Sequence, residues 1–315
     1  MQLINLDINI SYTLKLTIPE FNNPHLIHPK KFCSIVLLLL GFLLFNSFKL
    51  HSQSNDTLRY IFLGHIKEKR NGLDRVDQRL EQLDLSVYDR IWLGGDVTDE
   101  SNSRYSTLKY IDSLFDVSNP LNHWAFGNHD LRNFNVEWLE EITNKPTYYH
   151  HSSNGIVTIV LNYSYTPSDC ENLNKQFDLI KNVCDTISQS SHLIILSHYC
   201  PWNGAPGIPL PSAYAHSDIK AWIANCNDKP ATFVDVIYPL LVNVKNKGVE
   251  VINILGDTGS SNKGQSMISS DGIYFIASGI NKKSQDRSGP DKVLIFKHHV
   301  PTRSLEWDFH ILDSL

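Results

Sequence analysis

The sequence lacks a concentration of charge of either sign. Its 315 residues carry a formal net charge of −5, and Lys and Arg form no cluster or arginine-rich tract. A protein that binds nucleic acid through the phosphates needs such a basic surface. We therefore expect no nucleic-acid-binding surface on this protein.

An apolar run long enough to cross a membrane is also missing. The run from Ile35 to Phe45 is interrupted by Gly41 and falls short of the ~20 apolar residues that a spanning helix needs. It follows Lys30 and Lys31 and precedes polar residues, which is typical of a secretory signal peptide. We predict cleavage near residues 51–53, with no stable membrane anchor afterwards. A short membrane anchor is the alternative.

The cysteines contain no C-x-x-C pair after the leader, which argues against a zinc knuckle or a redox dithiol. Cys33 precedes the apolar run, which argues against a lipoprotein anchor. The four that remain, Cys170, Cys184, Cys200 and Cys226, predict two disulfides in an exported protein. The simplest pairing joins Cys170 with Cys184 and Cys200 with Cys226. Four cysteines permit three pairings, and four buried reduced thiols are the alternative.

The predicted leader, 1–52, is followed by one predicted domain, 53–315, which is expected to be secreted or periplasmic. In this domain strand and helix patterns alternate. Strands are predicted at 59–63, 91–93, 124–126, 147–149, 156–161, 193–197 and 251–255. Helices are predicted at 73–83, 107–115, 136–142, 173–187 and 233–244. The alternation, with a hairpin signal at 152–155, predicts an α/β fold in which two mixed β-sheets form a sandwich flanked by helices.

The stretch from Ile91 to Asp99 reads I-W-L-G-G-D-V-T-D. Three apolar residues predict a buried strand, two glycines allow a sharp turn, and Asp96 follows at the carboxyl end of the strand. An ordinary turn has the same pattern. About thirty residues on, however, the strand at 124–126 runs into Gly-Asn-His-Asp at 127–130. Two such strand ends rarely occur together by chance.

These motifs, G-D-V-T-D and G-N-H-D, resemble those of the calcineurin-like metallophosphoesterases. Strands that end at His198 and Asp257 continue the resemblance in the same order, so that it covers about Arg59 to Phe296. It implies a metallophosphoesterase-like fold and a metal-dependent phosphoric ester hydrolase in which a metal activates water. The substrate would be a small-molecule or polymeric phosphate ester, either a monoester or a diester.

The resemblance also implies roles for single residues. Asp96 would be the bridging carboxylate, Asn128 and His198 would bind the second metal, and His129 would be the general acid that Asp99 orients. Each residue has a plainer alternative. Asp99 could cap a helix, and His198 could be an ordinary hydrogen-bonded histidine.

The first and last motifs depart from the family pattern. His65 and Lys67 stand where the family has Asp and His, and Asp257 and Gly259 stand where it has two His. The first metal site would then keep only His65 and Asp96. Lys67 either supplies positive charge in place of the first metal or turns to solvent.

The second site keeps more of its ligands, so we expect one divalent transition metal (Zn, Mn or Fe) rather than two. Its predicted ligands are Asp96, Asn128, His198 and Asp257, whose oxygen and nitrogen donors suit these metals.

A proline-rich segment, Pro201 to His216, leaves directly from the His198 strand and is a candidate substrate loop. A rigid surface loop held by Cys200 is the alternative. Lys67, Arg132 and His216 are predicted to contact the substrate. Two functions follow from these patterns. One is a secreted metal-dependent phosphoesterase with His129 as general acid. The alternative is a degenerate relative that binds a phosphorylated or polyanionic ligand without turnover.

Overall fold

The computed structural model describes residues 56–133, 135–163, 169–200, 202, 204–209, 223–224, 231–258, 264–280 and 289–315. The chain divides into two compact units, Met1–Ser54 and Asn55–Leu315, and the described residues all belong to the second unit. The predicted signal peptide and its cleavage site therefore lie outside the described residues. Within the described part of the chain, no helix is long and apolar enough to cross a membrane.

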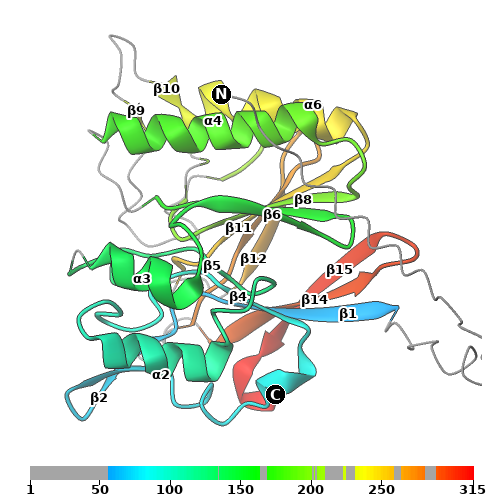
Figure 1. Cartoon of the computed structure of the whole chain (residues 1–315). Helices are drawn as coiled ribbons and strands as arrows, with labels where there is room; N and C mark the ends of the chain where they lie inside the picture. The colour runs from blue at the N-terminus through cyan, green and yellow to red at the C-terminus, as the bar shows by residue number, and fades with distance from the viewer. Residues whose placement is uncertain are drawn as a thin grey trace, which may run out of the picture. The chain divides into compact units, whose positions relative to one another are not determined.

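Two mixed β-sheets form the centre of this unit (Figure 1). The first sheet has the spatial order β15 (Ser304–Ile311), β14 (Lys292–His299), β1 (Thr57–Leu63), β4 (Arg90–Leu93) and β5 (His123–Trp124). The second sheet has the order β12 (Gln265–Ile268), β13 (Tyr274–Ala277), β11 (Glu250–Leu255), β8 (His192–Ser197), β7 (Ile156–Val160) and β6 (Tyr149–Ser153). In the first sheet β1, β4 and β5 run parallel, and β14 and β15 continue the sheet antiparallel. In the second sheet the four central strands run parallel, and the two edge strands, β12 and β6, are antiparallel to their neighbours.

Helices cover the outer faces of both sheets. Figure 1 shows α4 and α6 over the second sheet and α2 and α3 beside the first. The bounds of the helices are α2 Tyr105–Phe115, α3 Val136–Thr143, α4 Cys170–Thr186, α5 Phe233–Val236 and α6 Tyr238–Asn246. The remaining short elements are β2 (Lys67–Arg70), β3 (Leu73–Val76), η1 (Leu85–Val87), β9 (Ile223–Ala224), β10 (Ala231–Thr232) and η4 (Leu312–Ser314).

Alternate residues of the central strands face different layers. On β1, Ile61 and Leu63 pack with α2 and α3, whereas Tyr60 and Phe62 face the second sheet. The strand β8 alternates in the same way between α4 and α6 on one side and the first sheet on the other. Strands that are buried on both faces are apolar throughout. The predicted fold class, a two-sheet sandwich of mixed sheets flanked by helices, is therefore confirmed.

The helix predicted at 73–83 is wrong. Its first residues form β3, which pairs with β2 in an antiparallel hairpin. Asn71 and Gly72 connect the two strands with φ of 53° and 75°, a backbone that Asn-Gly adopts easily in two-residue hairpin turns. The hairpin predicted at 152–155 is confirmed, because β6 and β7 pair on either side of Asn154 and Gly155.

The two predicted cysteine pairings are wrong, because Cys184 and Cys200 are buried, reduced thiols. Cys170 is in a disulfide, so four reduced thiols, the alternative, are also wrong. Cys170 and Cys184 belong to the same helix, α4. Fourteen residues of helix rise ~21 Å, whereas a disulfide needs Cα atoms within ~7 Å. Burial raises the pKa of the Cys184 thiol to about 12. Cys226 lies outside the described residues.

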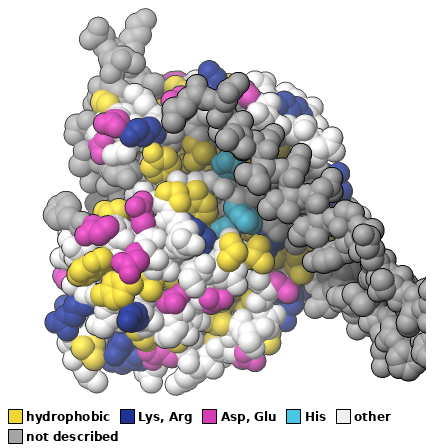
Figure 2. Space-filling model, in the orientation of Figure 1, with side chains coloured by type: hydrophobic (Ala, Val, Ile, Leu, Met, Phe, Trp, Pro, Cys, Tyr) yellow, Lys and Arg dark blue, Asp and Glu magenta, His cyan; other side chains and the backbone are white. Residues whose placement is uncertain are grey.

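The surface carries charges of both signs. On the face of the described residues that Figure 2 shows, Lys and Arg side chains lie interspersed with Asp and Glu.

Candidate active site at the carboxyl ends of the parallel strands

Three glycines bring the strand ends of the two sheets into backbone contact. Gly64 follows β1, Gly94 follows β4, and Gly256 follows β11 in the second sheet. A Cβ added to Gly64 would lie 2.6 Å from the Cα of Gly256, and one added to Gly256 would overlap the backbone of Gly94. Only glycine permits this approach. It places the residues that follow strands of both sheets in one site.

Asp96 lies at the centre of this site, in a left-handed backbone conformation with φ of 53°. Its side chain is 3% exposed. The backbone N–H of Asp96 donates to Asp130 Oδ2 at 2.8 Å. A non-glycine residue in this conformation is strained unless its surroundings hold it there.

Asp130 supplies that support and ties the loops after β4 and β5 together. Its carboxylate accepts hydrogen bonds from five groups, namely the N–H groups of Asp96, Val97 and Gly127, the hydroxyl of Ser101 and the indole of Trp124. The sequence motif contained Asp130, but no pattern in the sequence showed this role. The donors are mostly backbone groups, which side-chain identity does not reveal.

Several nitrogen atoms surround the Asp96 carboxylate. Lys67 Nζ donates to Oδ2 at 2.6 Å, and Nε2 of His65 and Nε2 of His129 each lie 3.8 Å from the same oxygen. On the other side, His198 Nε2 lies 3.4 Å from Oδ1. Burial opposes ionisation of Asp96, but His198, His65 and Lys67 outweigh it and hold its pKa well below the usual range. Lys67 does not turn to solvent.

His129 contacts both Asp99 and Arg132. Its Nδ1 donates to the Asp99 carbonyl oxygen at 2.7 Å and lies 3.1 Å from Asp99 Oδ1. Arg132 donates to His129 Nε2 at 2.9 Å. Nδ1 carries the ring proton, and Nε2 accepts the hydrogen bond from Arg132. The ring is therefore neutral in this arrangement. Asp99 therefore lies where it can orient the ring.

His198 is completely buried between the sheets. Its Nδ1 donates to the Gly94 carbonyl oxygen at 2.7 Å, and its Nε2 has no hydrogen-bond partner. This nitrogen lies 3.9 Å from Asp257 Oδ1. Burial lowers the pKa of His198, but the carboxylates of Asp96 and Asp257 outweigh burial, so its pKa is raised.

The remaining predicted residues are less closely joined to this centre. His65 Nδ1 donates to the Ile280 carbonyl at 3.3 Å, and burial lowers the pKa of the ring. The side chain of Asn128 is exposed on the loop after β5. His216, like most of the proline-rich segment, lies outside the described residues.

No family model matches the sequence, and no curated protein matches it either. The chain is similar to several solved structures at low identity. A predicted phosphoesterase from Streptococcus pneumoniae is 8% identical with a TM-score of 0.34, and the alignment covers 82% of this chain and 91% of that one. A metallophosphoesterase from Sphaerobacter thermophilus is 15% identical with a TM-score of 0.32, covering 80% and 87%.

A third similar structure is Vps29 from Chaetomium thermophilum, which is 8% identical with a TM-score of 0.31 and covers 80% of this chain and 97% of that one. At this level of similarity, function is inferred from the chain's own residues.

The predicted metal ligands do not fit a metal centre as they lie. Among the described residues, no group of three or more His, Cys, Asp or Glu side chains is placed to hold a metal ion. On the β1 side, the ammonium of Lys67 already contacts Asp96 Oδ2. On the β8 side, the carboxylates that the described part of the chain brings near the unpartnered Nε2 of His198 are those of Asp96 and Asp257, at 3.4 and 3.9 Å.

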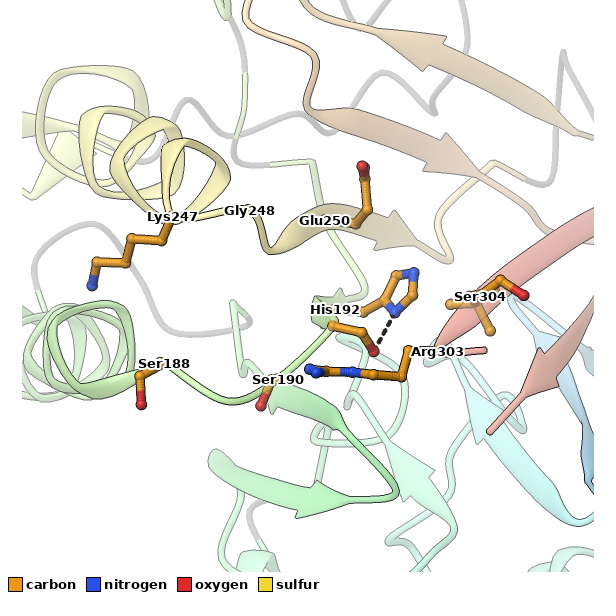
Figure 3. Close-up of a pocket in the computed structure, with 10 residues that line it drawn as sticks. Ser188, Ser190, His192, Lys247, Gly248, Glu250, Arg303 and Ser304 are labelled. Carbon is orange, nitrogen blue, oxygen red and sulfur yellow. Dashed lines mark hydrogen bonds between the residues drawn. The ribbon is translucent and has the colours of Figure 1, made fainter. Parts of the chain in front are cut away.

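A separate cavity of about 570 Å³ lies at the opposite ends of the same strands (Figure 3). Its lining includes His192 at the start of β8 and Glu250 at the start of β11. Strand residues rise ~3.3 Å each, so a six-residue strand separates this cavity from the Asp96 site by roughly 20 Å. Arg303 and Lys247 line it from either side.

Proposed function

We infer that the site around Asp96 binds a phosphate ester, in a phosphoesterase-like protein. The supporting observation is a row of three nitrogen-bearing side chains that begins at the Asp96 carboxylate. Lys67 Nζ lies 2.6 Å from Asp96 Oδ2, His129 Nε2 lies 3.8 Å from it, and Arg132 contacts His129 Nε2.

Charge and geometry both suit an oxyanion at this row. Lysine and arginine stay protonated near neutral pH, and the planar guanidinium matches two oxygens of a phosphate. Lys67 keeps N–H donors beyond the one that Asp96 accepts, and its side chain is 17% exposed. A phosphoryl group beside His129 would therefore meet two positive charges and one imidazole.

Hydrolysis of the ester is the second candidate, and the contact between His129 and Asp99 favours it. A carboxylate at Nδ1 stabilises the imidazolium, which can protonate a leaving-group oxygen from Nε2 when Arg132 turns to the phosphate. The single Zn, Mn or Fe ion predicted from the sequence finds no fitting group among the described residues. The ion pair between Lys67 and Asp96 favours binding without turnover.

Calorimetric titration of the full chain with inorganic phosphate and with aryl phosphate mono- and diesters tests the binding. Arg132→Ala and His129→Ala should each weaken binding. The exposed Lys297 on β14 lies outside the site, so Lys297→Ala serves as the charge-matched control. Equal affinities in all four proteins would contradict the proposed site.

Release of the aryl alcohol from the same esters, with and without added Zn²⁺, Mn²⁺ or Fe²⁺, separates the two candidates. Turnover that is lost in His129→Ala while metal content is unchanged supports hydrolysis. Absence of turnover in a wild-type protein that binds the esters supports binding alone.

We also propose that the protein is exported, as the basic and then apolar leader indicates. Amino-terminal sequencing of the folded protein should find a start shortly after Phe48. A start before Lys30 on soluble protein would overturn this proposal.

A further inference from the structure

The β2–β3 hairpin presents two lysines to the two aspartates of the G-D-V-T-D motif. Lys67 and Lys69 are two residues apart on β2, so their side chains leave the same face of the strand. Lys67 Nζ contacts Asp96 Oδ2 at 2.6 Å, and Lys69 Nζ lies 3.9 Å from Asp99 Oδ2. Main-chain pairing of Lys67 with Val76 holds the hairpin in register. The paired strand therefore fixes the backbone that carries Lys67, and the contact with Asp96 holds its ammonium.

The atoms around this ammonium are of the kind that bind transition metals. One is the carboxylate oxygen Oδ2 of Asp96. Another is Nε2 of His65, 3.8 Å from that oxygen. Because His65 Nδ1 donates to the Ile280 carbonyl, its Nε2 presents a lone pair toward the carboxylate. Carboxylate oxygen and neutral imidazole are ligands that Zn²⁺ and related ions prefer.

We propose that Lys67 is a tethered cation that takes the place of a metal ion between His65 and Asp96. The ammonium balances the charge of a carboxylate that is almost fully buried, as a bound metal would otherwise do. It also blocks the position, since an incoming divalent ion would meet a like charge at the oxygen it needs. This inference concerns Asp96 itself and does not require that a phosphate ester binds.

Replacing the cation by a ligand should therefore create a metal site. In Lys67→His the side chain is shorter by about the length of a metal–nitrogen bond, ~2 Å. An ion could then lie where the ammonium was, between His65, Asp96 and the imidazole introduced at position 67. Lys67→Arg keeps the charge and adds no ligand, so it is the matched control.

The measurement is the number of Zn²⁺ equivalents bound by full-length protein that has been stripped with chelator, by calorimetry and by elemental analysis after desalting. Lys67→His should bind one equivalent more than wild type, and Lys67→Arg should bind the same number as wild type. Adding His65→Ala to Lys67→His should remove the additional equivalent.

Circular dichroism and a thermal melt establish that each variant is folded. If Lys67→His does not fold, Lys67→Asp supplies a carboxylate at the same position. It should likewise bind one Zn²⁺ equivalent more than wild type. Folded variants that bind no more Zn²⁺ than wild type would overturn the proposal, as would an equal gain in Lys67→Arg. Phosphate titration of the wild-type protein is a separate measurement. If the wild-type protein does not bind phosphate, the proposed function is refuted and this inference is unaffected.

Discussion

The two ends of β8 and β11 differ in how closely the chain packs around them. At the carboxyl ends, Gly256 leaves no room for a Cβ against Gly94, and His198 is completely buried. At the amino ends, Gly248 has nothing within 4 Å of an added Cβ, and His192 borders an open cavity. The same pair of strands thus carries a site closed by backbone contact at one end and a solvent-accessible pocket at the other.

This difference shows what positions the charged groups of the Asp96 site. The sheets are close enough there for residues of both to share contacts, as His198 does with the Gly94 carbonyl and with Asp96. At the open end, Lys247 instead donates to the backbone carbonyl of Cys184 in the last turn of α4, and Arg303 donates to that of Gln189, between α4 and β8. Close contact of the two sheets, more than the side chains themselves, creates the candidate site.

Gly256→Ala should have the largest effect, because its methyl group would overlap the backbone of Gly94. Overlap with backbone cannot be relieved by a rotamer change, so we expect unfolding to become easier by roughly 4 kcal/mol or more. Urea denaturation followed by circular dichroism measures this change.

Gly248→Ala is the control at the other end of β11. Its φ of 85° is unfavourable for alanine, but no neighbour is displaced, so a loss of ~1 kcal/mol is expected. Equal losses in the two variants would show that the sheets do not depend on the contact at Gly256.

Asp130→Asn should have the next largest effect. The amide keeps one acceptor oxygen and turns two N–H donors toward groups that are themselves donors. The five donors that the carboxylate binds, among them the N–H of Asp96, would then compete for this one oxygen. Leaving buried donors unpaired costs ~1 to 3 kcal/mol each, so we expect a total loss of at least ~3 kcal/mol. The same urea titration measures it. A loss below 1 kcal/mol would mean that Asp130 does not hold the loop.

Much of the fold was predictable from the sequence, because strands buried on both faces are apolar throughout and helices repeat with a period of 3.6 residues. The helix predicted at 73–83 fails for a local reason. Its apolar spacing fits a helix, but Asn71 and Gly72 immediately before it adopt a hairpin turn that the spacing does not reveal.

For the site, motifs at the strand ends named Asp96, Asp99, His129 and His198, and the structure brings these four together. Two features were not predictable. Asp130 acts on backbone N–H groups, and the contact of Lys67 with Asp96 depends on the hairpin that the sequence analysis assigned to a helix. Long-range backbone proximity leaves no trace in local residue patterns.

The two histidines of the β8 segment should titrate in opposite directions. Burial lowers the pKa of His192, with Arg303 and Lys245 adding to the effect, whereas Asp96 and Asp257 raise that of His198. In an NMR titration, one ring should therefore titrate below ~6.5 and the other above it. Shifts in the same direction would mean that Asp96 and Asp257 do not outweigh burial at His198.

The effect of His192 on stability follows from the sign of its shift. Because the folded pKa is lowered, its stabilising contribution is complete above the unfolded pKa of ~6.5 and is lost as the pH falls through the folded pKa. When the pH is lowered from about 7 to about 5, the free energy of unfolding of His192→Asn should therefore fall less than that of wild type. Parallel urea titrations at both pH values test this expectation.

Lys247→Ala at the open end should have the smallest effect. The Lys247 ammonium donates to the Cys184 carbonyl oxygen at 2.8 Å, near the end of α4. A cation at the carboxyl end of a helix contributes ~0.3 to 1 kcal/mol when it is solvent-exposed, and salt screens it. We expect a loss of that size at low ionic strength that shrinks in 1 M NaCl, measured by urea denaturation. Lys247→Arg, which keeps the charge, should retain most of the stability. A loss in Lys247→Ala as large as that in Gly256→Ala would mean that the cavity end is as tightly packed as the Asp96 site, and the distinction between the two ends would fail.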